Sequence, residues 1–209
     1  MERNDSKMKN CLKRWKTVLL IALMVVPAVG CGKKVPKDSL TRPPEITLTA
    51  FVKEAGEITL QAGSYNWNYR ISREEESGGV ADAPSPLDET YPWEMMVLPA
   101  SASGEEEYQF SFEWIVKELE DKTDEINWPD ELMLISYDEA DIGNMEAEEV
   151  ETLTYTREDV EGENFMLPLH SGRVYDLVLT WSEEDYDKDG FYGTASYVFR
   201  TVTSEVEEE

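Results

Sequence analysis

The segment Asp185–Gly190 contains the residues of this chain that are best suited to bind a metal ion. Its sequence is Asp-Tyr-Asp-Lys-Asp-Gly, so carboxylates occupy alternate positions before a glycine, as in the first half of a calcium-binding loop. The oxygens of Asp185, Asp187 and Asp189 can converge on one cation at this spacing. The twelfth position, where such loops have a bidentate glutamate, is Ser196. The alternative is an acidic hairpin turn, because Asp-Gly is common in turns.

Four aromatic residues flank a long polar segment and could form a platform on which a sugar ring stacks. They are Trp67, Tyr69, Tyr91 and Trp93. Alternating aromatic side chains more often belong to a hydrophobic core. Carbohydrate binding and core packing are therefore both open for this set.

Catalytic groups are scarce. His170 is the only histidine, so it cannot build a zinc site on paired imidazoles, and no second histidine is present to activate a nucleophile. The sequence has no Gly-x-Ser-x-Gly segment. Glycosidases use a pair of carboxylates, but among 45 acidic residues such a pair can always be found, so its presence does not indicate glycosidase activity. We expect no enzymatic activity, and we expect His170 to lie in a turn before the last hairpin.

The N-terminal segment has the parts of a secretory signal peptide, namely a basic start, an apolar run from about Thr17 and small residues before Cys31. A cysteine after the pair Val29-Gly30 resembles the lipobox of bacterial lipoproteins. This resemblance implies that residues 1–30 are removed and that a lipid-modified Cys31 anchors the chain to the outer face of the cell membrane. An uncleaved membrane anchor is the alternative, although the apolar run of about thirteen residues is shorter than the roughly twenty of a membrane helix.

The chain from Cys31 onward is strongly acidic. It has 179 residues, 13 of them basic and 43 acidic, which gives a net charge of −30. A field of this sign excludes nucleic acid as a partner and attracts cations and basic partners. Since Cys11 belongs to the signal segment and Cys31 to the anchor, no disulfide holds the fold together. Its length is that of one domain.

Residues 31–44 have the composition of a tether, because Pro36, Pro43 and Pro44 favour an extended chain. The same segment holds a cluster of basic residues that suits an anionic membrane surface. These are Lys33, Lys34, Lys37 and Arg42.

Beyond the tether, apolar residues alternate with polar ones at the period of a β-strand. We expect strands at Glu45–Val52, Glu57–Leu60, Ser64–Tyr69, Trp93–Leu98, Glu107–Val116, Leu132–Tyr137, Leu153–Thr156, Arg173–Trp181 and Thr194–Val202. The last two form a long hairpin, residues 72–92 form a loop, and helical turns are expected near residues 146–149. The break at Ala62-Gly63 either bends one strand or separates two. This pattern predicts an all-β domain at 45–203, an immunoglobulin-like β-sandwich of antiparallel strands, followed by an acidic tail at 204–209.

Three segments, together with the lipobox, resemble small uncharacterised lipoproteins of Gram-positive, spore-former-type bacteria. The segments are Gly63-Ser64-Tyr65-Asn66-Trp67, Ala81-Asp82-Ala83-Pro84-Ser85-Pro86 and the hairpin that ends in Tyr197-Val198-Phe199. The resemblance implies a surface lipoprotein with a sandwich-like domain, and it carries over no catalytic residue.

These observations predict a lipid-anchored extracellular module that binds a protein or glycan partner and attaches to the membrane through Cys31. A calcium-dependent structural module and a carbohydrate-binding module are the alternatives. Calcium is the one cofactor that the sequence leaves open.

Overall fold

The computed structural model describes residues 40–50, 56–72, 74–98, 107–115, 128–161, 165–186 and 190–203. The chain divides into two compact units, 1–34 and 35–209, and every described residue belongs to the second. Within these ranges, no helix is long and apolar enough to cross a membrane. The predicted signal peptide, Cys31 and the acidic tail lie outside the described residues.

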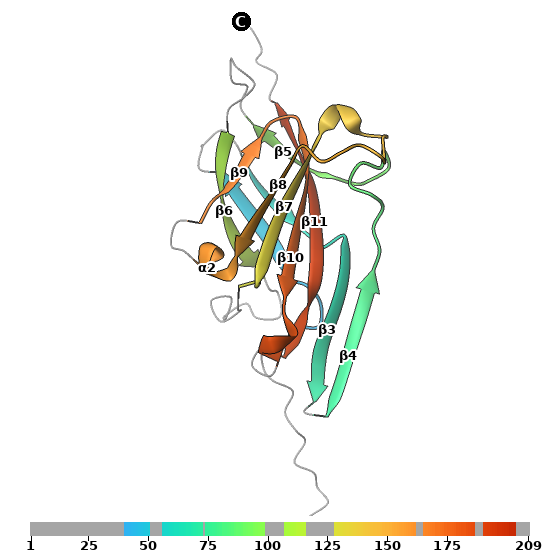
Figure 1. Cartoon of the computed structure of the whole chain (residues 1–209), viewed down its shortest axis with the longest axis vertical. Coiled ribbons are helices and arrows are strands. Elements are labelled where there is room, and N and C mark those ends of the chain that lie inside the picture. The colour runs from blue at the N-terminus through green and yellow to red at the C-terminus, as the bar shows by residue number, and fades with distance from the viewer. Residues whose placement is uncertain are drawn as a thin grey trace, which may run out of the picture. The chain divides into compact units, whose positions relative to one another are not determined.

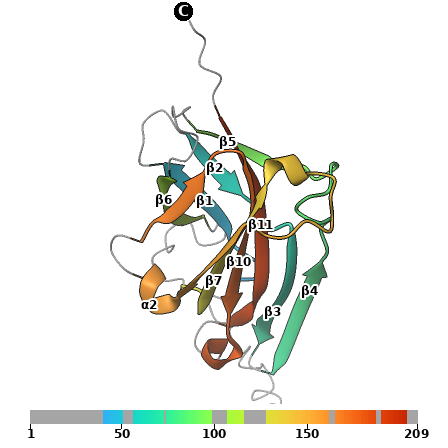
Figure 2. The ribbon, with the colours of Figure 1, turned by 45° about the horizontal axis from the view of Figure 1, so that its top comes forward.

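The described chain forms two β-sheets that pack in a sandwich-like arrangement, which confirms the prediction of an all-β fold (Figures 1 and 2). The smaller sheet has the order β2-β1-β6-β9 and the larger one the order β4-β3-β11-β10-β7-β8, with β5 also beside β11. The strands of the smaller sheet are β1 (Glu45–Ala50), β2 (Glu57–Leu60), β6 (Glu107–Ile115) and β9 (Leu167–His170). Those of the larger sheet are β3 (Ser64–Ser72), β4 (Glu75–Ala81), β5 (Glu94–Leu98), β7 (Glu131–Asp138), β8 (Glu151–Thr156), β10 (Arg173–Trp181) and β11 (Phe191–Thr203).

The predicted long hairpin is present as β10 and β11, which pair from Val174↔Arg200 to Trp181↔Gly193. Tyr175, Leu177 and Leu179 alternate with half-buried residues and point into the core, as the period of two requires. Across the pair, the ring of Tyr175 stacks on that of Phe199 with 5.2 Å between the centroids. The hairpin therefore forms the centre of the larger sheet.

The break at Ala62-Gly63 separates two strands that belong to different sheets. β2 lies at the edge of the smaller sheet, and β3 pairs with β11 and β4 in the larger one. One strand pair departs from the antiparallel prediction, since β5 runs parallel to β11 from Glu94↔Phe199 to Leu98↔Thr203. β3 and β5 thus pair with the same edge of the long strand β11, β3 along residues 191–196 and β5 along residues 199–203.

The prediction of an unpacked tether at 31–44 is wrong for its last five residues. Leu40 is 1% exposed and lies in the core. Its carbonyl accepts a hydrogen bond from Nε1 of Trp67 at 2.9 Å, and the carbonyl of Pro44 accepts one from the hydroxyl of Tyr197 at 2.7 Å. A proline-rich segment lacks donors for a β-ladder, but its carbonyls can still be bonded by side chains. The folded domain therefore begins at or before Leu40.

Two further predictions are wrong. The expected loop at 72–92 contains β4, which pairs with β3 and exposes residues on both faces, so its sequence shows no alternation of apolar residues. Residues 146–149 form no helix, because Glu146 ends a turn and residues 147–149 are irregular. The short helical elements lie instead at η4 (Glu139–Asp141), α2 (Arg157–Val160) and η5 (Glu183–Asp185).

Leu40→Ala should lower the free energy of unfolding by about 2–5 kcal/mol, because it removes a fully buried side chain from the core. Urea denaturation of the chain from residue 32 onward measures this change. The neighbouring exposed position supplies a control, since Thr41→Ala should shift stability by less than about 0.5 kcal/mol. Equal stability of both variants would show that residues 40–44 behave as a tether.

Candidate functional site

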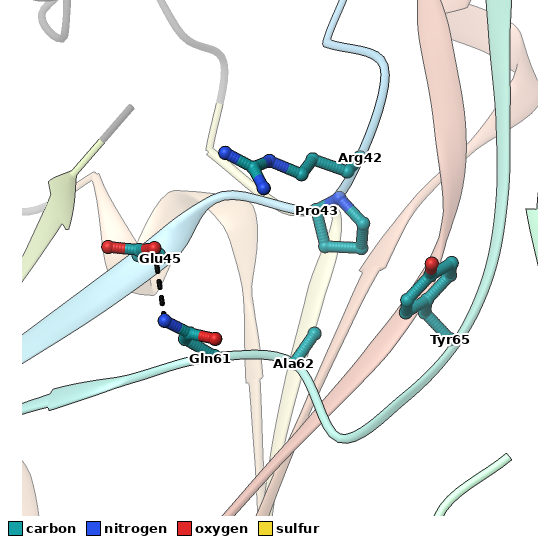
Figure 3. A pocket seen from close by; sticks show the side chains of 6 residues that line it. All are labelled: Arg42, Pro43, Glu45, Gln61, Ala62 and Tyr65. Carbon is teal, nitrogen blue, oxygen red and sulfur yellow. Dashed lines mark hydrogen bonds between the residues drawn. The ribbon is translucent and has the colours of Figure 1, made fainter. Parts of the chain in front are cut away.

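A pocket of about 190 Å³ lies where the chain passes from the smaller sheet to the larger one. Two segments line it, the N-terminal segment and the crossing from β2 to β3 (Figure 3). The lining residues are Arg42, Pro43, Glu45, Gln61, Ala62 and Tyr65. The pocket thus brings together the predicted tether and the Gly63–Trp67 segment, which are about twenty residues apart in the chain.

The register of the smaller sheet positions two polar groups of the pocket. Ile46 of β1 pairs with Leu60 of β2, and this places Glu45 beside Gln61. Gln61 Nε2 donates a hydrogen bond to Glu45 Oε1 at 3.3 Å. Ile46 and Leu60 are both buried, so the core fixes the backbone below these side chains. The pocket therefore has a carboxylate and an amide held side by side.

A second site lies on the outer face of the larger sheet, where Asp176 of β10 sits among apolar residues. Its Oδ1 accepts a hydrogen bond of 2.5 Å from Ser196 Oγ of β11. Burial raises the pKa of the Asp176 carboxyl, and the Ser196 bond opposes this shift. Burial is also the main cause that raises the pKa of Tyr91 and of Tyr137, and the charge of Asp176 adds to it in both. Asp176 is therefore a poorly hydrated carboxylate close to two phenols.

Two loops cover this part of the outer face. Residues 82–93 and 142–147 contribute to a second hydrophobic cluster, whose buried members are Leu87, Tyr91, Val174 and Val198. The backbone N–H of Gly143 donates to the carbonyl of Leu87 at 2.8 Å, which joins the two loops. The cover therefore consists of loops that are bonded to each other and packed on the sheet.

Gly63 has a physical role at the same place. A Cβ atom on it would lie 2.3 Å from the hydroxyl oxygen of Tyr91 and 3.5 Å from Cβ of Ala83. Its N–H donates to the carbonyl of Ser196 at 2.9 Å. Gly63, Ala83 and Val198 each belong to a different one of the three segments on which the family resemblance is based. Those three segments therefore meet on this face.

The four aromatic residues do not form one common platform, and of the two alternatives it is packing that the structure shows for them. Trp67 is 1% exposed, stacks on Phe191 at 5.2 Å and belongs to the core between the sheets, and Tyr69 packs against the same core. Tyr91 and Trp93 belong to the cluster on the outer face, with 6.0 Å between their ring centroids. Nε1 of Trp93 donates to the carbonyl of Pro86 at 2.9 Å. These rings stabilise two different parts of the domain.

The predicted calcium ligands fall largely outside the described residues. Asp187 and Asp189 are among the residues that the structure does not describe, and Asp185 ends η5. The flanks are described: Gly190 N–H donates to the carbonyl of Tyr186 at 2.9 Å, and the guanidinium of Arg70 lies 4.4 Å from the centre of the Tyr186 ring. Among the described ranges, no three His, Cys, Asp or Glu side chains are grouped to hold a metal ion. Calcium binding by this segment stays a prediction.

His170 is the last residue of β9 rather than a turn residue, and the turn follows it at Ser171-Gly172. Its backbone N–H donates a hydrogen bond to the hydroxyl oxygen of Tyr175 at 2.7 Å. Its carbonyl accepts a bond from Thr201 Oγ1 at 2.7 Å. The backbone of His170 thus joins the two sheets.

Sequence reasoning missed both sites. The pocket joins residues that no local pattern connects. Asp176 does carry a signal, because it is the one acidic residue within the apolar strand Arg173–Trp181. A carboxylate at such a position needs a partner, and Ser196 supplies it.

The fold and these sites define an all-β, sandwich-like domain with a small mixed-charge pocket and a poorly hydrated carboxylate on one covered sheet face. Comparison with protein-family models, with curated proteins and with solved structures finds no match to this chain. The resemblance to Gram-positive lipoproteins therefore stays a prediction.

Asp176→Asn should stabilise the protein at neutral pH. A carboxyl whose pKa is raised by folding contributes stability below its unfolded pKa, near 3.8, and loses it as the pH rises through the folded value. Asparagine removes the charge and keeps an acceptor for Ser196. We expect the melting temperature at pH 7 to rise by a few degrees, which corresponds to about 1 kcal/mol. The gain should shrink as the pH falls toward 4.

Asp82→Asn is the matched control, because Asp82 is exposed and the substitution removes the same charge from the acidic domain. Melting curves from pH 4 to pH 8 compare the two variants. An equal rise in both at pH 7 would mean that relief of general charge repulsion, and not burial of Asp176, is the cause.

Proposed function

We propose that this protein is a lipid-anchored binding module on the outer face of a Gram-positive cell membrane. The observation that carries the proposal is the short distance along the chain between Cys31, the predicted lipid site, and Leu40, which is fixed in the core. At about 3.5 Å per residue, these nine steps reach at most about 32 Å. An anchored Cys31 would thus keep the domain close to the bilayer.

Charge supports the same arrangement. Lys33, Lys34 and Lys37 lie within the span that would approach an anionic surface, and each basic residue there contributes about 1 kcal/mol of attraction. The chain from Cys31 onward nevertheless has a net charge of −30, so the rest of the domain is repelled from that surface. The domain would project outward, and its field favours a basic protein or glycan partner.

The scarcity of catalytic groups in the sequence supports binding rather than catalysis. His170 contributes to the fold through its backbone N–H and carbonyl, which are bonded to Tyr175 and Thr201. The pocket at Glu45 and Gln61 has groups that hold a ligand by hydrogen bonds and charge. We therefore propose a protein without enzymatic activity.

Cys31→Ser should abolish lipidation, so the chain should either remain as the uncleaved precursor or lose its membrane association. The test expresses both forms in a Gram-positive host and compares membrane and soluble fractions together with the intact mass. Two acyl chains on one cysteine are sufficient for stable anchoring, whereas a soluble domain has none. Unchanged mass and membrane association in the variant would contradict the proposal.

A calcium-dependent structural module is the second candidate, favoured by the spacing of Asp185, Asp187 and Asp189. The described flanks of this segment are held in place, because Gly190 bonds to Tyr186 and its carbonyl accepts the N–H of Arg70 at 2.8 Å. Ligands on a loop with fixed ends lose less freedom when they bind.

Calcium should raise the melting temperature of the chain from residue 32 onward if this loop binds it, with saturation at about 0.1–1 mM, as in extracellular modules. Magnesium at equal ionic strength controls for screening. Asp187→Asn should remove the calcium-specific rise. A rise that magnesium reproduces, or that survives in the variant, would identify general screening of the acidic charge.

A further inference from the structure

We propose that the outer edge of β4 binds an extended segment of a basic partner protein by β-strand addition, so that the partner contributes a further strand to the larger sheet. β4 (Glu75–Ala81) lies at one end of that sheet, and Figures 1 and 2 show it as the outermost strand beside β3. This inference deepens the proposed binding function, because it names the class of partner, and it rests on that function.

The hydrogen bonds of the neighbouring strand show which backbone groups of β4 are already used. The N–H of Arg70 donates to the carbonyl of Gly190, which continues the pairing of β3 with β11. Backbone groups of an antiparallel strand alternate between its two neighbours, so the even-numbered residues of β3 bond to β11 and the odd-numbered ones to β4. The β4 residues opposite these odd-numbered ones, which therefore bond to β3, are Ser77, Gly79 and Ala81.

The alternate residues of β4 have backbone N–H and C=O groups that point away from β3. They are Glu76, Gly78 and Val80. No strand in the part of the chain that the structure describes pairs with this edge. The register with β3 is continuous from Glu76 to Ala81, and the side chain of Val80 is 71% exposed. Hence β4 offers a regular row of donors and acceptors to another strand.

Among the described strands, the others at sheet edges are shorter or obstructed. β2 and β9 have four residues each, and β9 contains Pro168. β5 has five residues and lies against β2 of the other sheet. β8 leads directly into α2, and its Tyr155 packs against Phe165 with 5.1 Å between the ring centroids. β4 has seven residues and contains neither proline nor lysine, the residues that commonly protect an edge from pairing.

Charge selects a basic partner rather than a second copy of this chain. Glu75 begins β4 and Asp82 follows it, and both residues are exposed. They are seven positions apart, or about 23 Å along a strand, so an added segment passes a carboxylate near each of its ends. The chain from Cys31 onward has a net charge of −30, which attracts a basic segment and repels another copy.

The edge also defines the form of the partner. Its segment must be extended over about seven residues to pair with the whole of β4. β-Branched residues favour the extended form, and one of them opposite Val80 would cover a side chain that is now largely exposed. Lysine or arginine at the two ends would face Glu75 and Asp82. The partner is therefore a protein with an extended, basic segment that is rich in β-branched residues.

Amide hydrogen exchange tests the edge before any ligand is added, on the chain from residue 32 onward, which contains the second compact unit. The amides of Glu76, Gly78 and Val80 should exchange at least about tenfold faster than those of the alternate residues, which bond to β3. Sedimentation should show a monomer. Protection of these three amides in a monomer would mean that another part of this chain covers the edge, and protection in a dimer would mean that a second copy does. Either result would overturn the proposal.

The binding probe is the acetylated and amidated peptide Lys-Thr-Val-Thr-Val-Thr-Lys-Lys. Antiparallel pairing would place its lysines opposite the carboxylates at both ends of β4 and a valine opposite Val80. We expect saturable shifts of the β4 amides with a Kd of about 1 mM or tighter, and slower exchange of Glu76, Gly78 and Val80.

Two control peptides separate charge from backbone pairing. The first has glutamate in place of every lysine, so the field of the domain repels it. The second is N-methylated at both valines, so it lacks the donors that would face β4 but keeps the charge of the probe. Each should bind at least about tenfold more weakly than the probe.

Val80→Pro should weaken binding of the probe by about fivefold or more, because it removes an outward N–H and leaves the bonds from β4 to β3 in place. Glu75→Lys should weaken it by about threefold or more through like charge. Glu131→Lys makes the same change in net charge at an exposed position of β7, from which three strands separate β4, and should change affinity by less than about twofold. Melting curves confirm that each variant is folded.

Absence of shifts at about 10 mM peptide would overturn the proposal, as would equal binding of the N-methylated or the acidic peptide. Undiminished binding to a folded Val80→Pro variant would also overturn it. None of these results bears on membrane anchoring, because lipidation is read separately from the mass and fractionation of Cys31→Ser.

Discussion

The fold depends on two hydrogen bonds that attach the start of the domain to its core. The hydroxyl of Tyr197, which is fully buried in the last strand, donates to the carbonyl of Pro44 across 153 residues of chain. Nε1 of Trp67 does the same for Leu40. Each large aromatic ring would otherwise bury a polar atom without a partner. The prolines are suited to this contact because they supply acceptors without requiring a ladder of their own.

The same two bonds define the candidate site and its distance from the predicted lipid. They fix Arg42 and Pro43 above the β2–β3 crossing, and the pocket forms between these two segments. They also shorten the free part of the predicted tether. Stability, pocket shape and distance from a membrane are thus connected through one short stretch of chain.

Whether an element could be predicted from the sequence depends on the kind of interaction that holds it in the fold. β2 and β10 have the predicted bounds, since in each strand alternate apolar residues pack in or against the core. β4 was missed because its side chains are exposed on both faces, so no apolar period reveals it. Leu40–Pro44 was misassigned because proline content indicates extension but not what the extended chain contacts.

The candidate sites were harder to predict than the strands. The pocket requires Arg42 and Glu45 to meet Gln61 and Tyr65 across a change of sheet, which no local pattern encodes. The aromatic residues near positions 67 and 91 were recognised, but their division between two clusters depends on which face of the larger sheet each reaches. A single acidic residue in an apolar strand, Asp176, was the clue that could have identified the covered face.

The position of β11 constrains when this protein can fold. β11 pairs with β3, β5 and β10, and its Tyr197 holds the first described segment, so the last strand of the domain completes contacts with its beginning. Pairings between such distant parts of a chain make folding slow, because the entropy cost of closing the long loop comes before the contacts that stabilise it. The core therefore cannot close before β11 is available to join its three neighbouring strands and the first described segment.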